Sequence, residues 1–284
     1  MSKNIKLALY TDFSEESRVT LNTVIFNTWG FHFDLDVLCI LKDDNIQDAL
    51  EKLEELKKEL NFHLEDGHII QTKVFLKDEE DLLINHINRE SYFSLVVGVA
   101  DSEINWKPGS TYHTLYTMVK TDLALVPITH PIKIENRGIV SLEFKNLEKL
   151  HALKKSLEFF KFYHAKIRLI LLSDNLLSDN ETETVMEFIS NVLPELDIDL
   201  INVTKALCQE SILMAVLESP IDYFLYFNDD HLENLVQNKL EAAIMPGIHK
   251  FSLIKMYVDE HILNDLKYGQ VEMPKMRLKV LEEK

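Results

Sequence analysis

Glycine is scarce in this sequence, and its few residues are widely spaced. The 284 residues include 7 glycines, and no two of them lie closer than eleven positions. Phosphate-binding loops need clustered glycines, because backbone N–H groups must approach the phosphates closely. The spacing therefore excludes the GxGxxG loop, the GxxxxGK[ST] loop and the GxSxG nucleophile elbow.

Cysteine and long apolar runs are also lacking. Only Cys39 and Cys208 occur, with no CxxC pair, which fits a reducing compartment and excludes a disulfide framework or a cysteine zinc site. The start of the chain lacks the pattern of a secretion signal. No run approaches the roughly 18 to 20 apolar residues of a membrane span. We therefore expect a cytoplasmic protein that does not bind to the membrane.

Positive charge is deficient in both halves of the chain. The 30 Lys and Arg residues face 47 Asp and Glu residues, which gives a formal net charge of −17. Residues 1–132 carry 12 basic and 22 acidic groups, and residues 133–284 carry 18 and 25. Such a surface repels nucleic-acid phosphates and anionic lipids, so we expect no nucleic-acid partner.

Short apolar runs alternate with longer stretches of helical periodicity, a pattern typical of an α/β parallel sheet flanked by helices. The amphipathic stripe of the helix over 45–62 includes Ile46 and Leu50. Expected strands lie near 5–11, 33–41, 68–76, 92–100, 123–128, 139–144, 166–173, 198–203, 221–227 and 250–258. Expected helices lie from Ser14, which is the expected N-cap, over 45–62, from 78, and over 110–120, 146–163, 182–193, 210–217 and 231–244.

The same order of elements occurs twice, which indicates an internal duplication. The prediction is two tandem open parallel five-stranded sheets flanked by helices, in domains over 1–132 and 133–284. The stretch 129–138 is the expected linker, and a tail over 259–284 is left without an assignment.

One segment carries a resemblance to a known family. A buried first strand leads into YTDFSEESR (Tyr10 to Arg18). Later, Gly98 stands at the close of strand four and Gly109-Ser110-Thr111 at the start of the fourth helix. In these residues the chain resembles the universal stress protein family, over about 3–128 by sequence and over 137–258 by topology alone. The resemblance implies a Rossmann-like, adenine nucleotide alpha hydrolase-like fold. It also implies a tandem member whose halves form an intramolecular pseudo-dimer, with a homodimer as a further expectation.

The resemblance also implies a nucleotide site in the first domain. Asp12 and Ile40 would hold adenosine in an ATP-binding member, and Gly98, Gly109, Ser110 and Thr111 would hold the phosphates, or a small anion. A structural role is the alternative for two of these residues. Asp12 before a helix favours the helix dipole, and Ser110 after Pro108-Gly109 suits a turn and an N-cap.

The phosphate loop departs from the family pattern. Asp101 stands where the family has its second glycine, and Gly98 and Gly109 are eleven rather than thirteen positions apart. Glu103 adds a second negative charge, which only Lys107 opposes. Like charges in contact repel by roughly 1 kcal/mol in water and by more when partly buried, so triphosphate binding is expected to be weak or lost.

The second domain departs further. Glu143 takes the place of Asp12, Lys145 replaces the capping serine, and Phe227 and Asn228 stand where the first half has Gly98. We expect no nucleotide in this half.

The remaining candidates are weaker. The 11 histidines show no metal-ligand spacing, so no metal site is assigned. His113 and Tyr116 are expected on the surface of their helix, and Cys39 is expected to be buried and inert. No catalytic residue is assigned.

These observations favour a non-catalytic stress-response or regulatory binding protein that acts through unidentified protein partners and needs no cofactor. The alternative is an ATP sensor or slow ATPase that uses the first-domain site. A third hypothesis is a flavodoxin-like or adenosine-binding enzyme half.

Overall fold

The computed structural model divides the chain after Ile128 into two compact units, unit 1 up to that residue and unit 2 over Thr129–Met273. The described residues are 5–14, 17–18, 20–21, 33–41, 45–63, 69–99, 110–127, 137–154, 166–194, 196–218, 221–228, 234 and 252–258. The expected helix over 231–244, except residue 234, and the tail over 259–284 lie outside this set.

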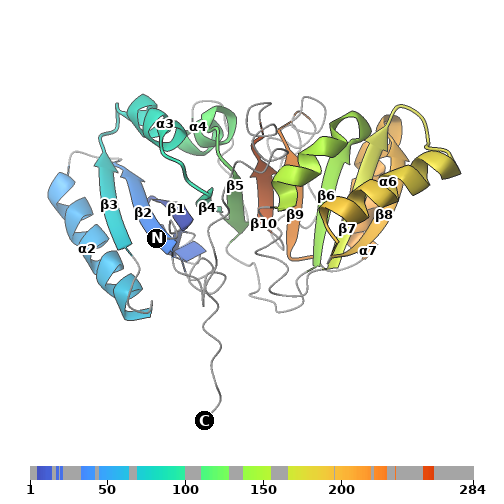
Figure 1. The fold of residues 1–284 in the computed structure, drawn as a ribbon. Coiled ribbons are helices and arrows are strands. Elements are labelled where there is room, and N and C mark those ends of the chain that lie inside the picture. Colours follow the sequence, from blue (N-terminus) through green and yellow to red (C-terminus); the bar gives the residue numbers. More distant parts are fainter. Residues whose placement is uncertain are drawn as a thin grey trace, which may run out of the picture. The chain divides into compact units, whose positions relative to one another are not determined.

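Unit 1 contains five strands in the order β3-β2-β1-β4-β5, and each neighbouring pair of them is parallel (Figure 1). Its strands are β1 (Ile5–Thr11), β2 (Phe33–Ile40), β3 (Ile69–Phe75), β4 (Ser94–Val99) and β5 (Leu123–Pro127). Its helices with full bounds are α2 (Ile46–His63), α3 (Glu80–Arg89) and α4 (Thr111–Met118).

Unit 2 contains a second parallel sheet, in the order β8-β7-β6-β9-β10. Its strands are β6 (Arg137–Glu143), β7 (Lys166–Ser173), β8 (Asp197–Thr204), β9 (Tyr223–Phe227) and β10 (Ser252–Met256). Its helices are the 3₁₀ helix η1 (Phe144–Lys149), α6 (Asp179–Val192), the 3₁₀ turn η2 (Lys205–Leu207) and α7 (Cys208–Glu218). The expected α/β class with two parallel five-stranded sheets is confirmed.

The strand registers align the two units residue by residue. Leu7 of β1 pairs with Ser94 of β4, and Gly138 of β6 pairs with Tyr223 of β9. Because β1 and β6 are each the third strand of their sheets, these pairs occupy equivalent positions. In unit 1 the larger residue of the pair, Leu7, is on the central strand. In unit 2 the larger residue, Tyr223, is on the neighbouring strand. A Cβ at Gly138 would overlap the Tyr223 ring, so only glycine fits there.

The central strands are apolar because helices cover both faces of a parallel sheet. Cys39 is buried, as expected. Each unit buries its own cluster of aliphatic and aromatic side chains. In unit 1 the cluster includes Leu9, Leu35, Val37, Leu53, Leu60 and Val96. In unit 2 it includes Val140, Leu142, Leu169, Leu171, Leu225 and Phe227.

Three expectations about individual helices were wrong. Tyr116 is not on the surface of α4 but 1% exposed, whereas His113 is half-buried. Ile46 and Leu50 were expected in the apolar stripe of α2 yet are 46% and 44% exposed, whereas Ala49, Leu53 and Leu60 are buried. In place of an α-helix from residue 146, the chain after β6 first forms the 3₁₀ helix η1.

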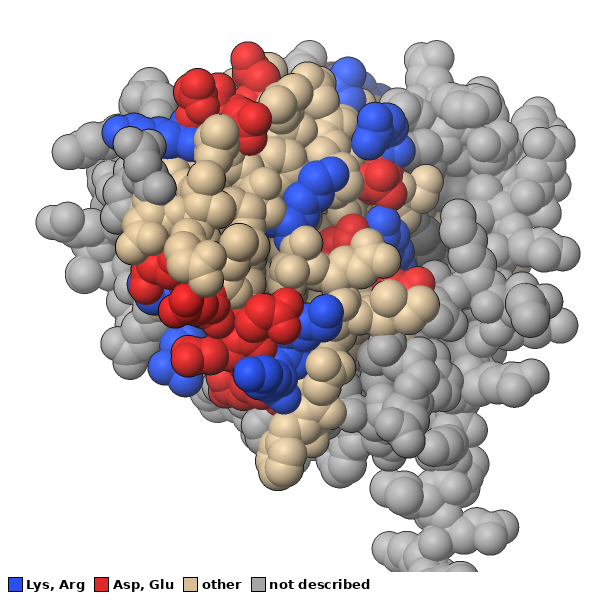
Figure 2. All heavy atoms as spheres, turned by 90° about the vertical axis from the view of Figure 1, so that its left-hand side faces the viewer, with Lys and Arg blue, Asp and Glu red and all other residues tan. Residues whose placement is uncertain are grey.

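Basic and acidic side chains are interspersed on the side of unit 1 that carries α2 and β3, around a broad uncharged area (Figure 2). On α2, Lys52 pairs with Asp48 at 2.7 Å, one turn earlier. No helix within the described ranges is long and apolar enough to cross a membrane.

A partly buried polar network ties α3 to the sheet of unit 1. Lys73 lies 3.3 Å from His86 Nδ1, and because an ammonium only donates, the imidazole proton is on Nε2. Nε2 therefore donates to the Tyr92 hydroxyl at 3.1 Å, which donates to Asp36 at 2.6 Å. Lys6 Nζ also pairs with Asp36, at 3.1 Å.

Glu90 completes this network at the C-terminal end of α3. It pairs with Lys6 at 2.8 Å, and its other oxygen lies 3.9 Å from His86 Nδ1. Burial lowers the pKa of His86, and the Lys73 ammonium lowers it further, although the carboxylates of Glu90 and Asp36 oppose the change. His86 is therefore neutral at neutral pH.

The network predicts that unit 1 loses stability in mild acid. The pKa of His86 is lower in the folded state than the usual value of about 6.5, so the unfolded chain binds the proton more readily. The stabilising contribution is complete above that pH and is lost as the pH falls towards the folded pKa. Thermal unfolding between pH 7.5 and 5.5 should shift less in the variant His86→Asn than in the wild type. Equal shifts in both proteins would contradict the assignment.

Candidate functional site

The chain turns sharply where β1 ends in unit 1. Asp12 Oδ1 accepts from the backbone N–H of Ser14 at 3.1 Å, and Phe13 adopts a positive φ of 61°. Ser14 Oγ accepts from the N–H of Ser17 at 3.4 Å, and Ser14 O accepts from the N–H of Arg18 at 3.3 Å. The expected capping role of Ser14 is confirmed.

Three candidate residues lie at one edge of the sheet. β1 pairs Thr11 with Cys39 of β2 and Tyr10 with Val97 of β4. Asp12, Ile40 and Gly98 follow these residues directly, so they share the carboxyl edge on either side of β1. The strand order reverses between β1 and β4, and ligands of open α/β sheets bind outside the carboxyl ends at such a point.

The start of α4 approaches this edge through two tyrosines. Tyr10 is buried at the end of β1, and its ring meets that of Tyr112 edge to face at 6.1 Å. The Tyr112 hydroxyl donates to Asp12 Oδ2 at 3.4 Å, and the Thr111 side chain lies close enough to Tyr10 to influence its pKa. Burial raises the pKa of Tyr10, so it stays protonated. Thr111 therefore lies near Asp12, because its neighbour Tyr112 contacts Asp12 directly.

Ser110 is an N-cap. Its Oγ accepts from the N–H of His113 at 3.2 Å, and its carbonyl accepts from the Thr114 hydroxyl at 3.1 Å. The alternative given for Ser110 is therefore present in the structure. The first N–H groups of a helix lack intrahelical acceptors, so the start of α4 keeps the dipole and donors that favour an anion.

Gly109 and the loop over 100–109, which holds Asp101, lie outside the described residues. The expectation that this loop weakens phosphate binding stays a prediction. Across the parts of the chain with described coordinates, no group of three His, Cys, Asp or Glu side chains is placed to hold a metal ion.

Sequence reasoning missed Tyr10 and Tyr112 as site residues. Tyr112 lies 100 positions from Asp12, and no local motif links the two. The available signal was Tyr112 itself, an aromatic residue with a polar hydroxyl in the first turn of a helix expected at the site.

The equivalent edge of unit 2 holds a buried salt bridge. The strand registers make Glu143 of unit 2 equivalent to Asp12 of unit 1. Ser141 pairs with Tyr226 in unit 2 as Tyr10 pairs with Val97 in unit 1, and Glu143 and Asp12 each lie two residues further along the chain. Glu143 is 1% exposed and pairs with Lys205 at 2.9 Å and with Lys145 at 3.1 Å.

The lysines determine the charge state of Glu143. Burial would raise its pKa, but Lys205 and Lys145 outweigh burial and lower it. Lys205 also pairs with Asp174 at 3.0 Å. Its ammonium therefore bridges two carboxylates at the edge where unit 1 has its candidate site, so this edge of unit 2 is occupied by the protein's own side chains.

The salt bridge predicts a stability effect that exceeds that of an ordinary surface pair. The variant Lys205→Met should lower the free energy of unfolding by about 1–3 kcal/mol, because Glu143 loses a partner inside the protein. Lys145→Met is the matched control, since that side chain is 67% exposed and its loss should cost less. Urea unfolding of both variants measures the difference, and an equal loss would contradict a special role for Lys205.

Comparison with solved structures identifies the fold. A universal stress protein from Archaeoglobus fulgidus DSM 4304 matches with a TM-score of 0.63 and 16% identity, over 90% of this chain and 97% of that chain. A putative universal stress protein from Pseudomonas aeruginosa UCBPP-PA14 matches with a TM-score of 0.57 and 13% identity, over 94% and 96%.

A third similar structure is the cytoplasmic domain of a prokaryotic cation chloride cotransporter, with a TM-score of 0.55 and 10% identity, over 92% of this chain and 99% of that chain. No protein-family model matches the sequence, and no curated protein does. At these identities the likeness concerns the fold. The chain therefore has the fold of the universal stress proteins.

Proposed function

We propose that the protein is a non-catalytic stress-response or regulatory binding protein in which nucleotide binding is weakened or lost. The observation that carries this proposal is the engagement of Asp12, whose two oxygens accept from Ser14 and Tyr112 of the same chain. A nucleoside hydroxyl would have to compete with the Tyr112 hydroxyl for that carboxylate.

Unit 2 supports the proposal independently. The buried pair of Glu143 and Lys205 occupies the equivalent edge, and a nucleotide there would have to break it. Phe227 of unit 2 is equivalent by register to Gly98 of unit 1. It therefore has an aromatic ring at a position where unit 1 has no side chain. Both edges are thus built around contacts within the chain, which favours binding to partners over turnover.

The cotransporter domain shows that a fold of this kind occurs in a protein other than a universal stress protein. By analogy, the protein partner proposed here need not belong to a stress pathway. Unidentified proteins in the cytoplasm are the proposed partners. An intramolecular pseudo-dimer and a homodimer are proposed separately, as the form in which the protein acts.

The second candidate is an ATP sensor or slow ATPase. Asp12, Ile40 and Gly98 share one edge of the sheet, and the first turn of α4 comes within hydrogen-bonding distance of Asp12. This arrangement favours a residual site of Asp12, Ile40, Gly98, Gly109, Ser110 and Thr111, with ATP as its ligand.

Calorimetric titration with ATP-Mg distinguishes the two functions. The wild type should show no binding up to about 1 mM, whereas the double variant Asp101→Gly, Tyr112→Phe should gain measurable affinity, since it removes an anion from the loop and the internal donor to Asp12. Asp78→Gly is the control, because it removes one negative charge from an exposed turn before α3. Micromolar binding by the wild type, or nucleotide that co-purifies with it, would establish the sensor instead.

A further inference from the structure

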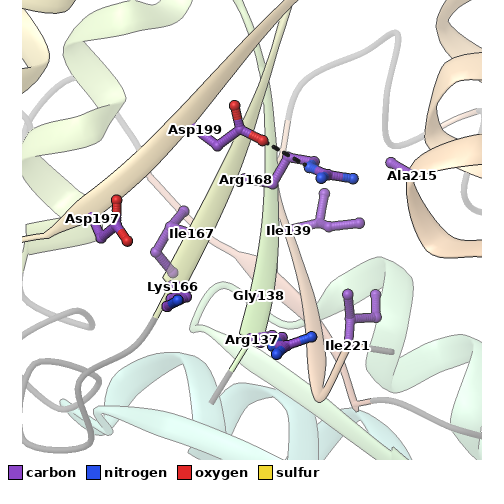
Figure 3. A pocket seen from close by; sticks show the side chains of 10 residues that line it. All are labelled: Arg137, Gly138, Ile139, Lys166, Ile167, Arg168, Asp197, Asp199, Ala215 and Ile221. Atoms are coloured by element: carbon purple, nitrogen blue, oxygen red, sulfur yellow. Dashed lines mark hydrogen bonds and ion pairs between the residues drawn. The ribbon is translucent and has the colours of Figure 1, made fainter. Parts of the chain in front are cut away.

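A pocket of about 230 Å³ opens in unit 2 at the amino ends of its strands (Figure 3). Arg137, Lys166 and Asp197 are the first residues of β6, β7 and β8, and they line it together with Ala215 of α7. The carboxyl edge with Glu143 is at the other end of the same strands. The pocket is therefore separate from the candidate site described above.

Two ring-bearing residues of unit 1 have small or aliphatic counterparts in this pocket. Helices α3 and α7 end at Arg89 and Glu218, each five positions before the next strand, β4 or β9. Ser94 and Tyr223 are equivalent by register. Counting back along the chain from these two residues makes His86 of unit 1 equivalent to Ala215 of unit 2, and Tyr92 equivalent to Ile221. Both Ala215 and Ile221 line the pocket.

In unit 1, the His86 and Tyr92 side chains are buried, with ring centroids 6.1 Å apart, and they fill the equivalent space. In unit 2, Ala215 and Ile221 stand in place of these two rings, and the pocket is the volume that the rings would fill. A cavity of about 150 Å³ already accepts a benzene ring, so one planar ring fits here.

The charge of this region is also reversed. Ala8 pairs with Asp36 in unit 1, and the equivalent Ile139 pairs with Arg168 in unit 2. The acceptor of the Tyr92 hydroxyl has thus become a guanidinium. Arg137 occupies the position in unit 2 that Lys6 occupies in unit 1, so a cation is present at both positions, while Arg168 replaces the carboxylate of Asp36.

The cations of the pocket outnumber its anions. Arg137, Lys166 and Arg168 line it together with Asp197 and Asp199. Asp199 accepts from Arg168 Nε at 3.1 Å and is 64% exposed, so it neutralises Arg168 only in part.

Figure 3 shows the guanidinium groups of Arg137 and Arg168 on the side of the strands where Ala215 and Ile221 lie, with Ile139 between them. Asp197 lies on the opposite side of this view. The pocket therefore combines an apolar wall with two donor groups that suit a planar anion.

We propose that this pocket binds a small aromatic carboxylate. The ring of the ligand takes the space that Tyr92 fills in unit 1, and its carboxylate supplies the anion that Asp36 supplies there, paired with Arg168 and Arg137. Guanidinium groups bind carboxylates through two parallel hydrogen bonds, which fixes the orientation of the ligand. For a ligand of this size we expect a Kd on the order of 0.1–1 mM.

The test is a titration of the full chain with benzoate, monitored by ligand-observed NMR. Benzamide, the neutral isostere of benzoate, is the control ligand. Benzoate should bind at least about tenfold more tightly than benzamide. Arg168→Gln should weaken benzoate binding by about tenfold or more, and Ile221→Tyr should abolish it by restoring a ring in the pocket. Arg89→Gln, which removes an exposed arginine from unit 1, should leave it unchanged.

Several outcomes overturn the proposal. These are the absence of benzoate binding at millimolar concentration, equal binding of benzamide, an unchanged affinity in Arg168→Gln, or displacement of benzoate by equimolar inorganic phosphate. Circular dichroism checks that each variant is folded. If Ile221→Tyr does not fold, Ala215→Leu fills the same pocket from α7, and retained benzoate binding in that variant would also overturn the proposal. None of these outcomes depends on whether unit 1 binds ATP.

Discussion

The carboxylate of Asp12 determines what the leading unit can bind, because both its oxygens accept hydrogen bonds from the same chain. One bond, from Ser14, shapes the turn between β1 and the following helix. The other, from Tyr112, joins that turn to α4. The residue that the family resemblance assigns to a ligand is therefore also part of what holds the two elements together, and a ligand could use it only by replacing a contact within the protein.

Two sheets with the same strand order carry different side chains at equivalent positions. The registers are equivalent, so each side chain of unit 1 can be compared with one of unit 2. At the carboxyl edge, Glu143 and Lys205 form a buried ion pair in unit 2. At the amino end the contrast is reversed, because Tyr92 fills the space in unit 1 and Ile221 leaves a pocket in unit 2. The two units thus differ in their side chains at both ends of the sheet.

Local patterns predicted most of the elements, since apolar periodicity reports which face of a strand or helix is buried. The capping role of Ser14 was likewise visible in sequence, because a cap depends on residues three positions apart. The burial of Tyr116 and the exposure of Ile46 were not, because they depend on what packs against each helix. The contact of Tyr112 with Asp12 joins residues far apart in the chain, and no periodicity encodes it.

The α/β class, the repeated order of elements and the chain segments that meet at the carboxyl edge could be predicted from the residues alone, because strand alternation and helical stripes follow from local burial. Which side chains fill each end of the sheets could not be predicted in this way, because it follows from the assembled fold. That choice depends on pairing between distant strands: it brings Lys205 to Glu143 and sets Arg168 where unit 1 has Asp36. Register is a property of the assembled sheet, and one residue of shift would move every side chain to the other face.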